Sequence, residues 1–232
     1  MKLGQTLEIR RGVAAVIGGG EKTTLLRTLG EELAEAGHTV LLCTTTKIYP
    51  FPGLVNLNSP SDRELHQALQ SARLAAAGAP IPETDKWGTL ELSMDRLAAL
   101  ADFVLVEADG SAGWPMKAHA PHEPVVPSQA NQTILVVGAS GFGRPIAQAA
   151  HRPERYAKLA GVSPDAPVSP EVEAAVLTAE GLHDKIYVNQ VDTQPLQHRP
   201  VHQLRFGGGG EDTHPQGLGE DQRIPRPGGG VG

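Results

Sequence analysis

Residues 13–24 decide the fold of this chain and have the sequence Val13-Ala14-Ala15-Val16-Ile17-Gly18-Gly19-Gly20-Glu21-Lys22-Thr23-Thr24. The apolar run predicts a buried strand, the glycines predict a tight turn, and the Lys-Thr-Thr sequence predicts the start of a helix. This succession is typical of a phosphate-binding loop, in which backbone N–H groups surround phosphates, a lysine contacts the outer phosphates and a hydroxyl holds Mg²⁺. Lys22 and Thr23 fit that pattern, whereas Val16 and Glu21 stand where it has glycine.

The rest of the chain alternates short apolar runs with helical patterns, which is typical of a parallel sheet covered on both faces. We therefore predict an α/β fold, a P-loop NTPase-like three-layer α/β/α arrangement with a mostly parallel sheet. Strands are expected at Val13–Ile17, Thr39–Cys43, Phe103–Glu107, Ile134–Val137 and Lys185–Asn189. Helices are expected from the glycine turn to Gly37, and at Asp62–Ala77, Leu90–Ala101, Pro153–Leu159 and Pro170–Gly181.

Composition limits the class of protein. The chain has 232 residues, 40% hydrophobic residues and a net charge of -6, which predicts one main core and argues against a nucleic-acid partner. The single cysteine, Cys43, excludes an internal disulfide, and the first residues lack the apolar run of a signal peptide. No apolar segment is long enough to cross a bilayer. We expect a cytoplasmic protein without a membrane or nucleic-acid partner.

Two segments depart from the α/β pattern. Residues 111–132 are rich in proline, histidine and polar residues, which predicts a long loop of functional importance. From about Leu196 the chain is dominated by Gly, Pro, Gln, His and Arg, which predicts disorder. The expected organisation is a nucleotide-binding domain at residues 1–195 and a disordered tail at residues 196–232.

Several motifs occur together along residues 7–193. Beside the phosphate loop they are Thr44-Thr45-Thr46-Lys47, Val106-Glu107-Ala108-Asp109-Gly110-Ser111, Pro115-Met116-Lys117-Ala118, His122-Glu123-Pro124-Val125-Val126-Pro127, His151-Arg152-Pro153-Glu154 and Val188-Asn189-Gln190-Val191-Asp192. In this order they resemble the YqeC family. The resemblance implies a bacterial P-loop protein that acts as an accessory factor for selenium-dependent molybdenum hydroxylases. It also implies glycine at the position of Glu21.

The candidate nucleotide-binding residues begin in the phosphate loop. Gly18, Gly19 and Gly20 would offer backbone amides, Lys22 would neutralise phosphate charge, and Thr23 would bind Mg²⁺. Thr24 belongs to the same set, although a structural role at the helix start is the alternative for it. For the whole motif the alternative is an ordinary helix amino terminus with a threonine cap.

An acidic motif follows the strand at residues 103–107. Glu107 or Asp109 would be the acid on the metal side, so that Lys22, Glu107 and Asp109 are the catalytic candidates and Thr23 and Glu107 the metal candidates. Gly110 would offer its amide to a terminal phosphate, as in the Asp-x-x-Gly element of GTPases. The alternative is that Asp109-Gly110 is a simple turn.

Two further motifs follow strands. Lys47, after the threonine run, would face the same crevice as the phosphate loop and bind a phosphate or substrate anion. Asn189 and Asp192 resemble the guanine-binding Asn-Lys-x-Asp element, with Gln190 in place of lysine. The alternatives are strand residues for the threonines and a polar strand exit for the last motif.

His119, His122 and His151 could form a metal site with Glu123, but prolines at 121 and 124 favour extended chain and hydrogen-bonding histidines instead. Within that loop, Lys117 and His122 would bind a second substrate or client. His151-Arg152 is the better candidate for an anionic ligand. Cys43 is expected to be a buried structural thiol.

Glu21 affects the predicted function most. A left-handed backbone there would cost about 1–3 kcal/mol, and a carboxylate within about 4 Å of a phosphate charge would oppose binding by roughly 4 kcal/mol at a dielectric constant of about 20. Three hypotheses follow. The chain is a nucleotide-binding accessory protein that binds ATP or GTP with Mg²⁺, with possible hydrolysis, and has a molybdenum hydroxylase or its maturation proteins as partner. Alternatively it is a degenerate binding module without turnover, or a small-molecule kinase or ligase.

Overall fold

The computed structural model describes residues 2–189, and within them the central feature is a sheet of eight strands. Its order is β10-β8-β1-β6-β2-β4-β3, with β5 paired to β4. All pairings are parallel except that between β4 and β5. The strands of this sheet are β1 (Gly12–Gly18), β2 (Val40–Thr44), β3 (Val55–Asn58), β4 (Leu74–Pro80), β5 (Trp87–Gly88), β6 (Phe103–Glu107), β8 (Ala130–Gly138) and β10 (Lys185–Asn189).

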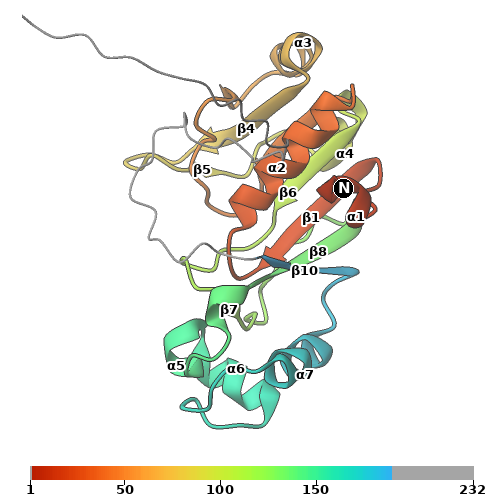
Figure 1. Cartoon of the computed structure of the whole chain (residues 1–232). Helices are drawn as coiled ribbons and strands as arrows, with labels where there is room; N and C mark the ends of the chain where they lie inside the picture. Colours follow the sequence, from red (N-terminus) through yellow and green to blue (C-terminus); the bar gives the residue numbers. More distant parts are fainter. Residues whose placement is uncertain (1, 190–232) are drawn as a thin grey trace, which may run out of the picture. The chain divides into compact units, whose positions relative to one another are not determined.

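Helices cover both faces of the sheet, as Figure 1 shows. They are α1 (Leu3–Thr6), α2 (Lys22–Glu35), α3 (Asp62–Ala72), α4 (Met94–Leu100), the 3₁₀ turn η1 (Ala139–Gly141), α5 (Ile146–Ala149), α6 (Pro153–Ala160) and α7 (Pro170–Glu180). A small parallel pair, β7 (Met116–Lys117) and β9 (Ala150–His151), lies apart from the main sheet. The predicted α/β fold with a mostly parallel sheet is therefore confirmed.

Alternate residues of β1 explain the two-sided core, because successive side chains of a strand point to opposite faces. Ala14 and Val16 pack in the cluster that contains the leucines of α2. Ala15 and Ile17 pack in a second cluster with α5, α6 and α7. A third cluster joins α3 and α4 to β2 and β6. In Figure 1, α5 to α7 form a group next to β7, beyond the carboxyl end of β1.

Helix α2 follows the predicted pattern. Leu25, Leu26 and Leu29 are buried, and Leu33 packs against the same cluster. The helix ends at Glu35, and Gly37 has a φ of 93°, the left-handed conformation expected of a terminating glycine. The sequence thus determines this helix locally as well as through its packing.

Four sequence predictions need correction. The helix expected at Asp62–Ala77 ends at Ala72, because Arg73 is left-handed (φ 58°) and the chain continues as β4. The helix expected at Leu90–Ala101 is shorter and covers Met94–Leu100, with Ser93 as its cap. The expected loop at 111–132 contains β7 and the start of β8. Strands β3, β4 and β5 were not predicted from the sequence.

The predicted tail from Leu196 lies outside the described residues. In the part of the chain that the structure describes, none of the helices combines the length and the apolar character needed to span a membrane.

Candidate functional site

The phosphate loop connects the end of β1 at Gly18 to the start of α2 at Lys22. Gly18 has a φ of 101°, and a Cβ there would lie 2.4 Å from the carbonyl oxygen of Val136. A Cβ on Gly19 would lie 2.2 Å from the carbonyl oxygen of Pro115. Both positions therefore require glycine, because the loop packs against the backbone of β8 and of the segment before β7.

Several loop amides have acceptors within the protein. The Gly18 N–H donates to Asp109 Oδ2 (2.8 Å), and the Gly20 N–H donates to the Trp114 carbonyl (3.0 Å). The side-chain amide of Asn189 satisfies both of its polar groups when its oxygen accepts from the Glu21 N–H (3.2 Å) and its nitrogen donates to the Val137 carbonyl (2.9 Å). These contacts fix the loop before any ligand binds.

The amides of Thr23 and Thr24 differ from these loop amides. Among residues 2–189, the N–H groups of Thr23 and Thr24, in the first turn of α2, have no hydrogen-bond acceptor. Unsatisfied amides at a helix start favour an anion, because they carry the positive end of the helix dipole.

Lys22 is buried, with 3% of its side chain exposed. Its Nζ donates to the Gly18 carbonyl (2.7 Å) and to Ser111 Oγ (3.3 Å), and lies 3.3 Å from Asp109 Oδ1. The lysine of the motif thus folds back against the loop and the segment after β6.

Thr23 and Glu107 form the second polar contact of the loop. Glu107 ends β6 and is the register partner of Val16 in β1, so its carboxylate lies beside the loop. The Thr23 hydroxyl donates to Glu107 Oε2 at 2.8 Å. Burial raises the pKa of Glu107, and the repulsion from Asp109 adds to it, while the charge of Lys22 and the Thr23 hydrogen bond oppose the rise.

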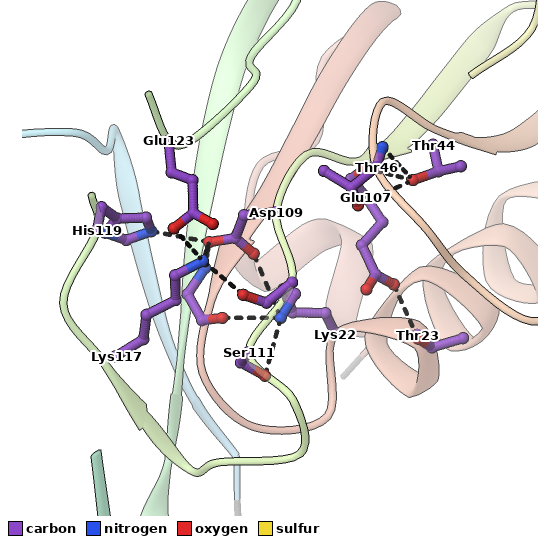
Figure 2. A network of polar contacts seen from close by, with 12 residues as sticks. Lys22, Thr23, Thr44, Thr46, Glu107, Asp109, Ser111, Lys117, His119 and Glu123 are labelled. Carbon is purple, nitrogen blue, oxygen red and sulfur yellow. Dashed lines mark hydrogen bonds and ion pairs between the residues drawn. The ribbon is translucent and has the colours of Figure 1, made fainter. Parts of the chain in front are cut away.

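Asp109 lies on the other side of the Lys22 side chain from Glu107, as Figure 2 shows. Besides the Gly18 amide, its Oδ2 atom contacts Lys117 Nζ (3.0 Å) and His119 Nε2 (2.8 Å). Burial alone would raise the pKa of Asp109, but the His119 hydrogen bond, the charges of Lys22 and Lys117 and the Gly18 amide lower it strongly. Asp109 is therefore a carboxylate held in its charged form.

The contacts of Asp109 continue into the helices beyond the sheet edge. Lys117 also lies 3.1 Å from Glu123 Oε2, and Arg152 binds both oxygens of Glu123 (2.8 and 3.0 Å). The second ring nitrogen of His119 lies 2.7 Å from Glu180 Oε2. Burial lowers the pKa of His119, but the two carboxylates outweigh it and raise that pKa. His119 thus links the segment after β6 to the end of α7.

Glu21 has a φ of -90° and a ψ of 60°, so the backbone at this position is not left-handed. The strain that a non-glycine residue would cause in a left-handed loop is therefore absent. Its carboxylate lies 3.4 Å from the Thr24 hydroxyl. The remaining effect of Glu21 is its negative charge at the start of α2.

The threonine run after β2 serves local structure. The Thr44 hydroxyl donates to the Glu107 carbonyl (2.9 Å) and accepts from the Thr46 N–H (2.9 Å). The Thr45 hydroxyl donates to the Val125 carbonyl (2.7 Å). Lys47 is exposed and makes no ion pair with the residues that the structure describes.

The remaining candidates have varied surroundings. Gly110 is exposed, and its carbonyl accepts from Lys117 (2.6 Å). Asn189 contacts the phosphate loop, and Asp192 lies outside the described residues. Cys43 is buried, and burial raises the pKa of its thiol to about 12. Within residues 2–189, no cluster of three or more His, Cys, Asp or Glu side chains could hold a metal ion.

Sequence reasoning did not find the contact between Asp109, His119 and Glu180. One weak signal existed, since Lys117 and His119 are two residues apart and an extended segment places such side chains on one side. Glu180 gives no signal, because it joins the cluster only through the packing of α7 against the sheet edge. For Arg152 the structure supplies an anion from the protein itself, the carboxylate of Glu123.

Comparison with known proteins places these residues in a family. The sequence profile described as "YqeC protein" matches residues 14–154 of this chain. The chain belongs to the YqeC family. The range shared with the YqeC family contains the phosphate loop, Glu107, Asp109, Lys117 and His119.

A curated YqeC relative gives the same assignment. The chain is 32% identical over 174 residues to the "Uncharacterized protein YqeC" of Escherichia coli (strain K12), across 68% of this chain and 64% of that protein. The match thus spans slightly less than two thirds of the relative's length. No solved structure matches the chain significantly.

Proposed function

We propose that this chain binds ATP or GTP together with Mg²⁺ at residues 18–24 and acts as an accessory protein in the maturation of selenium-dependent molybdenum hydroxylases. The observation that carries the nucleotide part is the 2.8 Å contact between Thr23 and Glu107 beside Lys22. The maturation part rests on the resemblance to the YqeC family alone.

The side chains present suit a magnesium nucleotide. Mg²⁺ prefers oxygen ligands and is usually held by one or two protein oxygens together with phosphates and water. The Thr23 hydroxyl and the Glu107 carboxylate offer such oxygens, and they already contact each other. The two unsatisfied amides of Thr23 and Thr24 suit phosphate oxygens. A bound magnesium nucleotide would supply the phosphoanhydride and the metal charge that neutralises it.

The protein's own groups would then have separate roles in binding the phosphates and the metal. Lys22 provides a positive charge to the phosphates, and the amides of the first turn of α2 donate hydrogen bonds to them. Glu107 must be charged to serve a metal, so its raised pKa opposes Mg²⁺ binding at low pH. Together these groups position the phosphates and balance their charge, which is most of what phosphoryl transfer requires of a protein.

A degenerate binding module is the second candidate, and one observation favours it. The N–H groups of Gly18 and Gly20, which a phosphate would need in a typical loop, already donate within the protein. Glu21 adds a negative charge at the same place. Such a loop could bind a client without turning over a nucleotide.

Nucleotide titration of the full chain and of Glu21→Gly separates the two candidates. Glu21 has a negative φ, so its backbone is not strained, and the charge of its half-buried carboxylate is partly screened by water. We therefore expect the two proteins to bind Mg-ATP or Mg-GTP at micromolar levels and within about threefold of each other. The fluorescence of Trp114, whose carbonyl accepts from Gly20, should report binding, with the buried Trp87 as the constant background.

Three outcomes have distinct meanings. Binding only by the glycine variant would establish the degenerate module. Binding by neither protein would refute a nucleotide site. A preference for GTP over ATP would support base recognition near Asn189, although its side chain contacts Glu21 and Val137 in this structure.

A further inference from the structure

The ammonium group of Lys22 is surrounded by oxygens of the protein itself. A lysine ammonium has three N–H donors. Lys22 Nζ has three protein oxygens around it, from Gly18 (2.7 Å), Ser111 (3.3 Å) and Asp109 (3.3 Å). Two of these contacts are hydrogen bonds and the third is the ion pair with Asp109, so a phosphate that takes the third N–H of Lys22 competes with Asp109.

The two oxygens of Asp109 differ in how firmly they are held. Oδ2 contacts the Gly18 amide, Lys117 and His119, all within 3.0 Å. Oδ1 is buried and faces Lys22 at 3.3 Å, yet within the described part of the chain it takes part in no hydrogen bond. The carboxylate can thus lose its contact with Lys22 and keep the other three.

We propose that Asp109 is a positioning residue that holds Lys22 in place of phosphate, and that an incoming phosphate group displaces it. This inference rests on the proposed function, since it assigns a means of regulation to the same loop. Lys117 and His119 allow the exchange because they keep two cations on Asp109 after Lys22 turns to the ligand. Glu123 and Glu180 hold those two cations in turn.

The exchange predicts opposite effects for two substitutions in the same cluster. Asp109→Asn removes the competing charge and also an anion close to the phosphates, so phosphate binding should become tighter. His119→Gln removes a cation from Asp109, which then attracts Lys22 more strongly, so phosphate binding should become weaker. General damage to the site would weaken binding in both variants.

The test is calorimetric titration of magnesium-free inorganic triphosphate into the full chain and its variants. We expect about tenfold tighter binding for Asp109→Asn and about three- to tenfold weaker binding for His119→Gln, in the range that one charged hydrogen-bond partner commonly contributes. Glu35→Gln is the matched control, since it removes one carboxylate that pairs with Lys2 at the surface, away from Lys22, and should change the affinity by at most about threefold.

Each result either supports or overturns the proposed exchange of Asp109 for phosphate at Lys22. Weaker or unchanged binding by a folded Asp109→Asn variant would overturn the exchange, as would binding of triphosphate by none of the folded proteins. If circular dichroism shows that Asp109→Asn does not fold, His119→Gln decides alone, and tighter or unchanged binding overturns the inference.

The outcomes for the exchange and for the proposed function can be told apart. If the unmodified chain binds neither magnesium nucleotide while Asp109→Asn binds triphosphate tightly, the proposed function fails and the exchange stands. If the unmodified chain binds nucleotide and Asp109→Asn binds triphosphate more weakly than it does, the proposed function stands and the exchange fails.

Discussion

A buried carboxylate lies at each end of the phosphate loop, and the pKa values of these two carboxyl groups shift in opposite directions. Glu107 contacts the Thr23 hydroxyl, and its pKa is raised. Asp109, two residues later, contacts Lys22, Lys117 and His119, and its pKa is lowered. Figure 2 shows the two side chains on opposite sides of Lys22.

Burial does not explain this difference, because both carboxylates are buried, at 7% and 0% exposure for Glu107 and Asp109. The number of cations and N–H donors in contact with each carboxylate explains it. The carboxylate on the Lys22 side therefore has three cationic side chains as partners, whereas the carboxylate of Glu107 accepts one hydrogen bond, from the Thr23 hydroxyl, among the described residues.

The largest expected effect contrasts Asp109→Asn with Glu107→Gln in the free energy of unfolding. Asp109→Asn should lose about 3–5 kcal/mol near neutral pH, because it leaves buried cations without their anion. Glu107→Gln should be neutral or stabilising at the same pH, because it removes a carboxylate that burial makes costly to ionise. Urea unfolding of both variants measures this, and losses of similar size would refute the contrast.

The pH dependence of the same two groups should also have opposite sign. The pKa of Asp109 is lower in the folded state than in the unfolded state, so its contribution to stability is present at neutral pH and lost as pH falls through the folded value. The pKa of Glu107 is higher in the folded state, so its contribution is present below the unfolded value and lost as pH rises through the folded one. Comparing each variant with the unmodified chain across pH isolates each contribution.

Glu173 extends the comparison to a carboxylate far from the loop. It is buried in α7 and accepts from the Tyr156 hydroxyl, and burial raises its pKa to about 7 despite that hydrogen bond. Relative to Glu173→Gln, the unmodified chain should lose roughly 3 kcal/mol of stability between about pH 4.5 and 7. Denaturant titrations at both ends of this range test it, and a stability difference independent of pH would refute it.

For Lys22→Met we expect at least about 100-fold weaker binding of Mg-ATP or Mg-GTP, close to 3 kcal/mol, because a buried phosphate charge loses its cation. Lys185→Met is the matched control, since Lys185 pairs with Glu8 at the surface. Its affinity should equal that of the unmodified chain. If Lys22→Met binds within threefold of the unmodified chain, Lys22 is not a phosphate ligand.

The smallest expected effect concerns the Thr23 side. Thr23→Val keeps the shape and removes the hydroxyl, so nucleotide affinity should fall about tenfold with Mg²⁺ present and change little without it. Thr24→Val provides the control, because among the described residues the Thr24 hydroxyl hydrogen-bonds only to Glu21. An equal loss with and without Mg²⁺ would show that Thr23 does not serve the metal.

The sequence predicted much of the fold, because five apolar runs correspond to β1, β2, β6, β8 and β10. These strands are buried in the middle of the sheet or carry β-branched residues, so their local pattern and their final structure agree. Strand β4 was missed for a physical reason. Leu74-Ala75-Ala76-Ala77 has high helix propensity, but in the fold it lies between β2 and β3 and bonds to both.

Within the candidate site, local sequence indicated the groups but not their partners. Lys22, Thr23 and Glu107 were found from motif spacing, and the structure brings them together. The sequence placed Glu107 or Asp109 on the metal side, with Thr23 and Glu107 as the metal candidates. The structure separates them, since the Thr23 hydroxyl contacts Glu107 and Asp109 faces Lys22.

By itself the sequence determined the parallel α/β architecture, the glycine loop and the family, because strand pattern, glycine geometry and motif order act over short stretches of chain. Only the tertiary structure decided the state of the loop. Asp109, His119 and Glu180 are distant in the sequence and meet where α7 packs near the sheet edge. The charge of a buried group depends on such neighbours in space, and no local pattern determines them.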